Sequence, residues 1–78
     1  MNSMKELRKR LRENIWERET ICKEAGLTFE ALKRKLYNPG RFTFFDIIVI
    51  KKVMKLSMDE TIKIFVPRVA KYNNEGEE

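Results

Sequence analysis

Histidine is absent from this 78-residue chain, and cysteine occurs once, at position 22. Without histidine, no Ser–His or Cys–His pair can form, so the commonest activated nucleophiles are excluded. One cysteine without histidine also excludes the usual zinc sites, and Cys22 has no partner for an internal disulfide. We therefore expect neither an enzyme nor a metalloprotein, and the lone thiol fits a reducing, cytoplasmic environment.

Glycine and long apolar stretches are also scarce. The three glycines are isolated at positions 26, 40 and 76, so no glycine-rich phosphate loop is present. No run of eighteen apolar residues occurs, and the first residues lack the apolar stretch of a secretory signal. We expect one small domain with a thin core, without a membrane span, a cofactor or a small-molecule substrate.

Positive charge is what the chain does have, and it is unevenly distributed. The net charge is +5, and all of this surplus falls within residues 1–41, whereas residues 42–78 are balanced. A one-sided basic surplus indicates a polyanionic partner, which could be DNA, RNA or an anionic membrane. The alternative is an ordinary solvated surface that is rich in lysine and arginine.

Apolar residues at intervals of three and four predict an all-α fold of five short helices. We expect these helices at about residues 4–14, 17–25, 29–37, 44–56 and 58–66. Ser3, Thr28, Thr43 and Ser57 precede four of them as candidate N-caps, and Glu6, Asp46 and Glu60 follow three of these caps as capping-box partners. Residues 1–72 would form the domain, and residues 73–78 a flexible acidic tail.

The same spacing predicts which side chains face inward. Leu7, Leu11 and Ile15 would form the apolar stripe of the first helix, with Trp16 packed at its junction with the second. The other expected core residues are Ile21, Cys22, Ala25, Leu32, Leu36, Ile47, Ile50, Val53 and Met54. The opposite side of the first helix carries Arg8, Lys9, Arg10 and Arg12.

Gly26 interrupts a pattern that would otherwise suit one helix over residues 4–38. A rod of about 35 residues would be unusually long for a small domain, and glycine is favoured just past a helix end. Thr28 follows as a cap. We therefore predict a turn at Gly26 between two helices, which is a helix-turn-helix arrangement at about residues 17–37.

Residues 18–38, RETICKEAGLTFEALKRKLYN, resemble the helix-turn-helix of the phage Cro/repressor-type family, also called the XRE family. The matching features are the aliphatic and small pair Ile21-Cys22, the turn Ala25-Gly26-Leu27, and the aliphatic Leu32. The following segment, with its asparagine loop, its Phe-Thr cap and its LSMDE opening of the last helix, is also similar. The resemblance covers about residues 5–66. It implies a compact lambda-repressor-like fold and a sequence-specific, double-stranded DNA-binding transcriptional regulator, such as a repressor of a phage or mobile element.

In such a family the recognition helix, here about residues 28–37, lies in the major groove with its first residues at the base edges. The resemblance thus implies base contacts from Thr28, Phe29, Glu30 and Lys33, and phosphate contacts from Arg18, Arg34, Asn38 and Arg41. Arg18 stands where the family often has a phosphate-binding glutamine. Phe29 has packing between helices as its alternative role, and Glu30 has that of a helix-start acid.

Binding as a homodimer to a near-palindromic site is the expected mode, with self-association through the fifth helix and residues 66–72. Three alternatives remain open. The scaffold could serve as a protein-interaction module, such as an antirepressor or adaptor. The basic first helix could lie on a membrane surface, although its apolar stripe is narrow. Catalysis is the most remote alternative.

Overall fold

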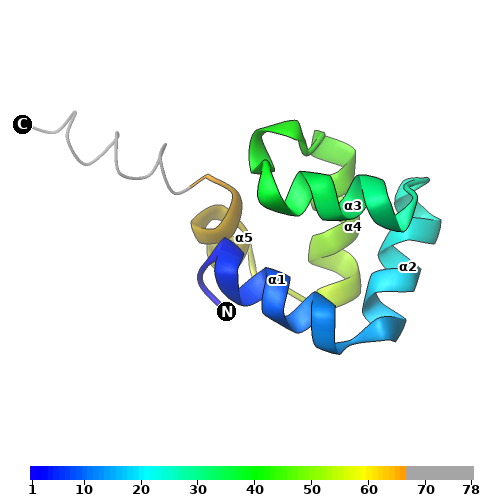
Figure 1. Cartoon of the computed structure of the whole chain (residues 1–78). Coiled ribbons are helices and arrows are strands. Elements are labelled where there is room, and N and C mark those ends of the chain that lie inside the picture. Colours follow the sequence, from blue (N-terminus) through cyan, green and yellow to red (C-terminus); the bar gives the residue numbers. More distant parts are fainter. Residues whose placement is uncertain (67–78) are drawn as a thin grey trace, which may run out of the picture.

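The computed structural model describes residues 1–66, and over this range the chain forms five α-helices and no strand (Figure 1). The helices are α1 (Met4–Glu13), α2 (Ile15–Ala25), α3 (Phe29–Tyr37), α4 (Phe44–Met54) and α5 (Met58–Phe65), with a single 3₁₀ turn, η1 (Pro39–Arg41), between α3 and α4. The predicted all-helical fold with five helices is confirmed for these residues. The predicted acidic tail at 73–78 and most of the self-association segment lie outside the described residues.

Each α-helix begins at a side chain that accepts a hydrogen bond from the backbone of its first turn. The four predicted caps, Ser3, Thr28, Thr43 and Ser57, all act in this way. Asn14 is a fifth cap, which the sequence analysis missed, and it accepts from the backbone N–H of Glu17 at 3.1 Å. Since such caps satisfy otherwise unpaired N–H groups, they explain where these helices start.

The core lies where α2 packs against α1, α3 and α4, while α5 packs against α1 and α4. In Figure 1, α4 passes behind α3, and α2 closes one side of the molecule. The buried apolar side chains are Leu7, Leu11, Ile21, Leu32, Leu36, Phe42, Val49, Ile50, Met54, Leu56 and Ile64. The predicted inward residues Cys22, Ala25, Ile47 and Val53 are partly buried against this cluster.

The predictions that Ile15 lies in the apolar stripe and that Trp16 packs at the helix junction are wrong. Ile15 and Trp16 are 57% and 67% exposed, because α1 ends at Glu13 and Asn14 starts a new helix. Because Ile15 belongs to a new helix, it does not continue the apolar stripe of Leu7 and Leu11. Glu17 turns inward instead, and its carboxylate binds Arg10 of α1 through two hydrogen bonds.

The predicted turn at Gly26 is confirmed as the end of α2. Gly26 has a φ of 68°, in the left-handed region that favours glycine. The backbone N–H groups of Gly26 and Leu27 both donate to the carbonyl oxygen of Cys22, the latter at 2.9 Å. This pattern is a common helix ending, and it separates α3 from α2.

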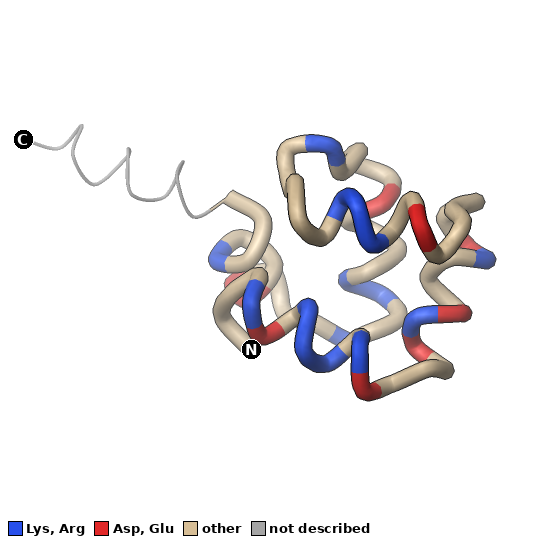
Figure 2. The backbone as a smooth tube through the Cα atoms, in the orientation of Figure 1, with Lys and Arg blue, Asp and Glu red and all other residues tan. Residues whose placement is uncertain are grey.

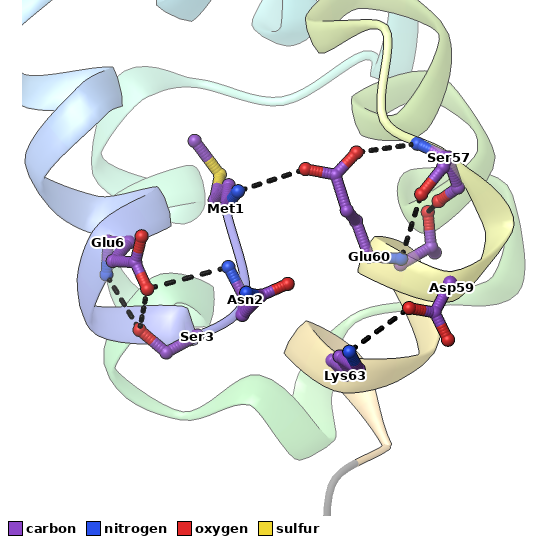
Figure 3. Close-up of polar contacts among 9 residues, drawn as sticks. Met1, Asn2, Ser3, Glu6, Ser57, Asp59, Glu60 and Lys63 are labelled. Atoms are coloured by element: carbon purple, nitrogen blue, oxygen red, sulfur yellow. Dashed lines mark hydrogen bonds and ion pairs between the residues drawn. The ribbon is translucent and has the colours of Figure 1, made fainter.

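The start of α5 is tied to the N-terminus (Figure 3). Ser57 and Glu60 form a complete capping box, and the Glu60 carboxylate also accepts from the Met1 ammonium at 2.9 Å. The backbone N–H of Ser57 and this ammonium lower the pKa of Glu60 to about 2. In α1, by contrast, the predicted capping box is incomplete, because the Glu6 carboxylate accepts from Asn2 N–H and the Ser3 hydroxyl rather than from Ser3 N–H.

Candidate nucleic-acid interface

One side of helix α3 packs against the core, and the other side is exposed. Leu32 and Leu36 are buried in the core, and Ala31 and Lys35 are partly buried beside them. The remaining side chains, at Phe29, Glu30, Lys33, Arg34 and Tyr37, are exposed. The outer side of α3 therefore carries two aromatic rings, two cations and one carboxylate.

A partly buried ion pair holds α3 against α4. Lys35 donates from Nζ to Oδ2 of Asp46 at 2.5 Å, and Asp46 is only 3% exposed. Burial alone would raise the pKa of Asp46, but the hydrogen bonds from Lys35 and from the backbone and hydroxyl of Thr43 outweigh it, and the pKa is lowered. The carboxylate thus caps α4 and holds α3 at once, which orients the exposed side of α3.

Seven of the eight predicted contact residues are exposed. Thr28, Phe29, Glu30, Lys33, Arg34 and Asn38 are exposed on α3 or at its ends, and Arg41 is exposed in η1. The Thr28 hydroxyl oxygen accepts from the Ala31 backbone N–H, and the hydroxyl hydrogen and the side-chain methyl group remain available to a ligand. Glu30 and Arg34 face each other at 3.9 Å, and both side chains are more than 80% exposed, so this pair is weak and easily opened.

Arg18 differs from the other seven because it is half-buried. Its guanidinium lies over the ring of Phe29, 4.3 Å from the centroid. This stack connects the start of α2 to the start of α3 and gives Phe29 a packing role although its side chain is 49% exposed. The stacked guanidinium keeps its planar edge of N–H donors, which is the part that binds phosphate oxygens.

Arg8 forms a second stack of the same kind, which the sequence analysis did not predict. Its guanidinium lies 4.9 Å from the ring centroid of Tyr37 and donates from Nη1 to the carbonyl oxygen of Leu36 at 3.0 Å. In the sequence, Arg8 is only one of four basic residues on the outer side of the first helix. Its position beside α3 follows from how α1 packs, which no local pattern encodes.

Basic residues occur along both α1 and α3, as the backbone colours of Figure 2 show. Arg10 and Lys35 are neutralised by the buried carboxylates of Glu17 and Asp46. Arg8, Arg12 and Lys33 form no ion pair with any of residues 1–66. Their charge is therefore available to an anionic partner.

No protein-family model, curated protein or solved structure matches this chain.

Proposed function

We propose that the chain is a sequence-specific, double-stranded DNA-binding regulator that places α3 in the major groove. The observation that carries this proposal is the exposed side of α3, where base-reading and phosphate-binding residue types project from a rigidly held helix. Helix α2, the turn at Gly26 and α3 would form the helix-turn-helix of a lambda-repressor-like fold, as the resemblance to the phage Cro/repressor-type family implies.

The chemistry of each side chain suits a defined contact. Lys33 can donate to guanine O6 or N7, and Glu30 can accept from cytosine N4 when its weak pair with Arg34 opens. Thr28 and Phe29 can touch a thymine methyl group. Phosphate contacts from Arg18, Arg34, Asn38 and Arg41 would fix the register on the duplex without reading sequence.

Fluorescence anisotropy with a pool of duplex fragments, followed by footprinting of the bound fragments, tests the proposal. With five or six phosphates engaged, log K should fall against log salt concentration with a slope of about −5. Affinity that does not depend on salt, or that is equal for all fragments, would contradict a basic, sequence-reading surface.

A charge-reversed variant tests whether α3 is the element that binds. Lys33→Glu combined with Arg34→Glu should weaken binding by at least tenfold, since one lost contact to a base corresponds to about 1–3 kcal/mol. Lys52→Glu is the control, because Lys52 is an exposed cation on α4 with only a loose contact, 3.4 Å, to Glu24. It reverses one charge whereas the α3 variant reverses two, so the losses in log K are compared per reversed charge. Equal losses per reversed charge would indicate non-specific attraction rather than recognition by α3.

Helix α5 supports a homodimer as the binding form. Met58 and Ile62, one turn apart on α5, are 63% and 42% exposed, which leaves an apolar strip uncovered in the monomer. Two symmetric recognition helices would protect two half-sites about 34 Å apart. A footprint with a single half-site would exclude the dimer and retain binding by α3.

An apolar surface on α4 favours a protein-interaction module as the second candidate function. Phe44, Phe45 and Ile48 lie within one turn of each other and are 79%, 57% and 45% exposed. Exposed aromatic residues of this kind are frequent where proteins bind one another. If the charge-reversed α3 variant keeps its regulatory effect, this surface rather than α3 carries the function.

A further inference from the structure

A cleft of about 250 Å³ lies between α1 and α3. It is lined by Arg8, Leu11, Arg12, Arg18, Phe29, Lys33, Leu36 and Tyr37. Four of these eight residues are cationic and none is acidic. The rest are two buried leucines and two aromatic rings, so the cleft combines strong positive charge with apolar walls.

Two of the cations are held in place before any ligand arrives. The Arg18 guanidinium is stacked on Phe29, and the Arg8 guanidinium is stacked on Tyr37 and bound to the carbonyl of Leu36. Because their positions are already fixed, less side-chain entropy is lost when they bind an anion. Arg12 and Lys33 are exposed and can close on a ligand from the rim.

The size and lining of the cleft indicate what it would accept. A volume of about 250 Å³ corresponds to roughly eight water molecules at about 30 Å³ each, which is more than a lone phosphate fills. It lies just below the usual range of small-molecule pockets, about 300–1,000 Å³. A phosphate with an adjoining sugar or base fits these dimensions, and its less polar part would contact the leucines and rings.

We propose that the α1–α3 cleft binds one nucleotide unit, with its phosphate among Arg8, Arg12 and Arg18 and its sugar beside Phe29 and Tyr37. The unit can come from a strand of bound DNA or from a free mononucleotide. The first source rests on the proposed DNA-binding function, whereas the second does not. Because Phe29 and Lys33 belong both to the cleft and to the proposed base-reading surface, a free nucleotide would compete with DNA.

The free source is tested by titrating the protein with the four ribonucleoside 5′-monophosphates, with adenosine as the uncharged control, and recording amide NMR shifts. Shifts should map to α1, the start of α2 and α3, and adenosine should produce none. Arg12→Gln should weaken nucleotide binding at least fivefold. Lys52→Gln, which removes the same charge outside the cleft, should not. Arg8→Lys is a second cleft variant that keeps the charge but loses the planar guanidinium, and it should also bind nucleotides more weakly.

The DNA source is tested with the same variants in anisotropy. Arg12→Gln should reduce the magnitude of the slope of log K against log salt concentration by about one. It should leave the preferred sequence unchanged, since a phosphate contact carries no base information.

Weaker binding by the cleft variants in either assay supports the site, and the assay in which it occurs shows whether the nucleotide comes from DNA or is free. No effect in either assay overturns it. If the unmodified protein binds no duplex at all, the proposed function fails, and the nucleotide titration alone decides the cleft.

Discussion

Glu17 is a charged residue inside a small core, and Arg10 binds its buried carboxylate. Its side chain is 7% exposed, and Arg10 contacts both carboxylate oxygens, through Nε at 3.0 Å and Nη2 at 2.6 Å. The hydrogen bond to Glu17 is the main reason that the pKa of Arg10 is raised. The Arg10 side chain is 42% exposed, so the two partners are not equally buried.

This difference in burial predicts unequal effects of removing either partner. Arg10→Gln leaves a buried carboxylate without its counter-ion and should lower the free energy of unfolding by about 1–3 kcal/mol. Glu17→Gln lets Arg10 turn into solvent and should lower it by about 1 kcal/mol. Urea unfolding followed by circular dichroism measures both.

Lys52→Gln serves as the control for this comparison, because its pair with Glu24 is exposed and should change stability by less than about 1 kcal/mol. A double-mutant cycle with Arg10→Gln and Glu17→Gln would give the coupling between them. A loss for Arg10→Gln no larger than that for Glu17→Gln would show that the unequal burial of the two side chains does not decide the cost.

At the scale of elements, α2 and α4 end with the same backbone geometry but with different residues. Gly26 has a φ of 68°, and Lys55 has a φ of 55°. In both endings the next residue donates its N–H five positions back, from Leu27 to Cys22 at 2.9 Å and from Leu56 to Lys51 at 3.0 Å. The left-handed conformation costs a residue with a Cβ about 1–2 kcal/mol, so α4 ends less favourably than α2.

Exchanging the residue types at these two endings should change stability in opposite directions. Lys55→Gly should raise the free energy of unfolding by about 0.5–1 kcal/mol, because part of the gain is offset by the greater freedom of glycine in the unfolded chain. Gly26→Ala should lower it by about 1 kcal/mol through φ alone, since no atom lies within 4 Å of the added Cβ.

Thermal unfolding is a sensitive readout, because about 1 kcal/mol shifts Tm by roughly 4–8 °C in a domain of this size. Gly40→Ala is the matched control, since its added Cβ also meets open space and its φ is not positive. A loss at Gly40 as large as that at Gly26 would show that glycine content, rather than the left-handed turn, sets the stability.

The elements that were predictable from sequence are those with local chemical signals at their ends. Gly26 marks the end of α2 and Thr28 the start of α3, and the spacing of Leu32 and Leu36 predicts which side of α3 is exposed. The start of α2 was missed because Asn14 was not recognised as a cap, and the predicted positions of Ile15 and Trp16 failed with it. The cleft was not predictable, since Arg8 reaches α3 only through the packing of α1.

At the scale of the whole molecule, two carboxylates connect different segments of the chain. Asp46 joins α4 to Lys35 of α3, and Glu60 joins α5 to the Met1 ammonium. The pKa of Asp46 is lowered from 3.8, and that of Glu60 from 4.5 to about 2. Protonation of either group therefore loosens contacts between different parts of the fold.

These two carboxylates predict acid unfolding in a defined pH range. Each has a lower pKa in the folded chain, so the unfolded chain binds more protons as the pH falls, and stability is lost with them. The contribution should be complete above a pH of about 4.5 and should disappear as the pH falls towards about 2. Urea midpoints measured across this range should decline steadily.

The combined variant Asp46→Asn with Glu60→Gln should be less stable at neutral pH and show a flatter decline below pH 4.5. Glu13→Gln removes an exposed carboxylate without either contact and should keep the original decline. If the combined variant lost stability with acid as steeply as the unmodified protein, other carboxylates would have to drive the acid transition.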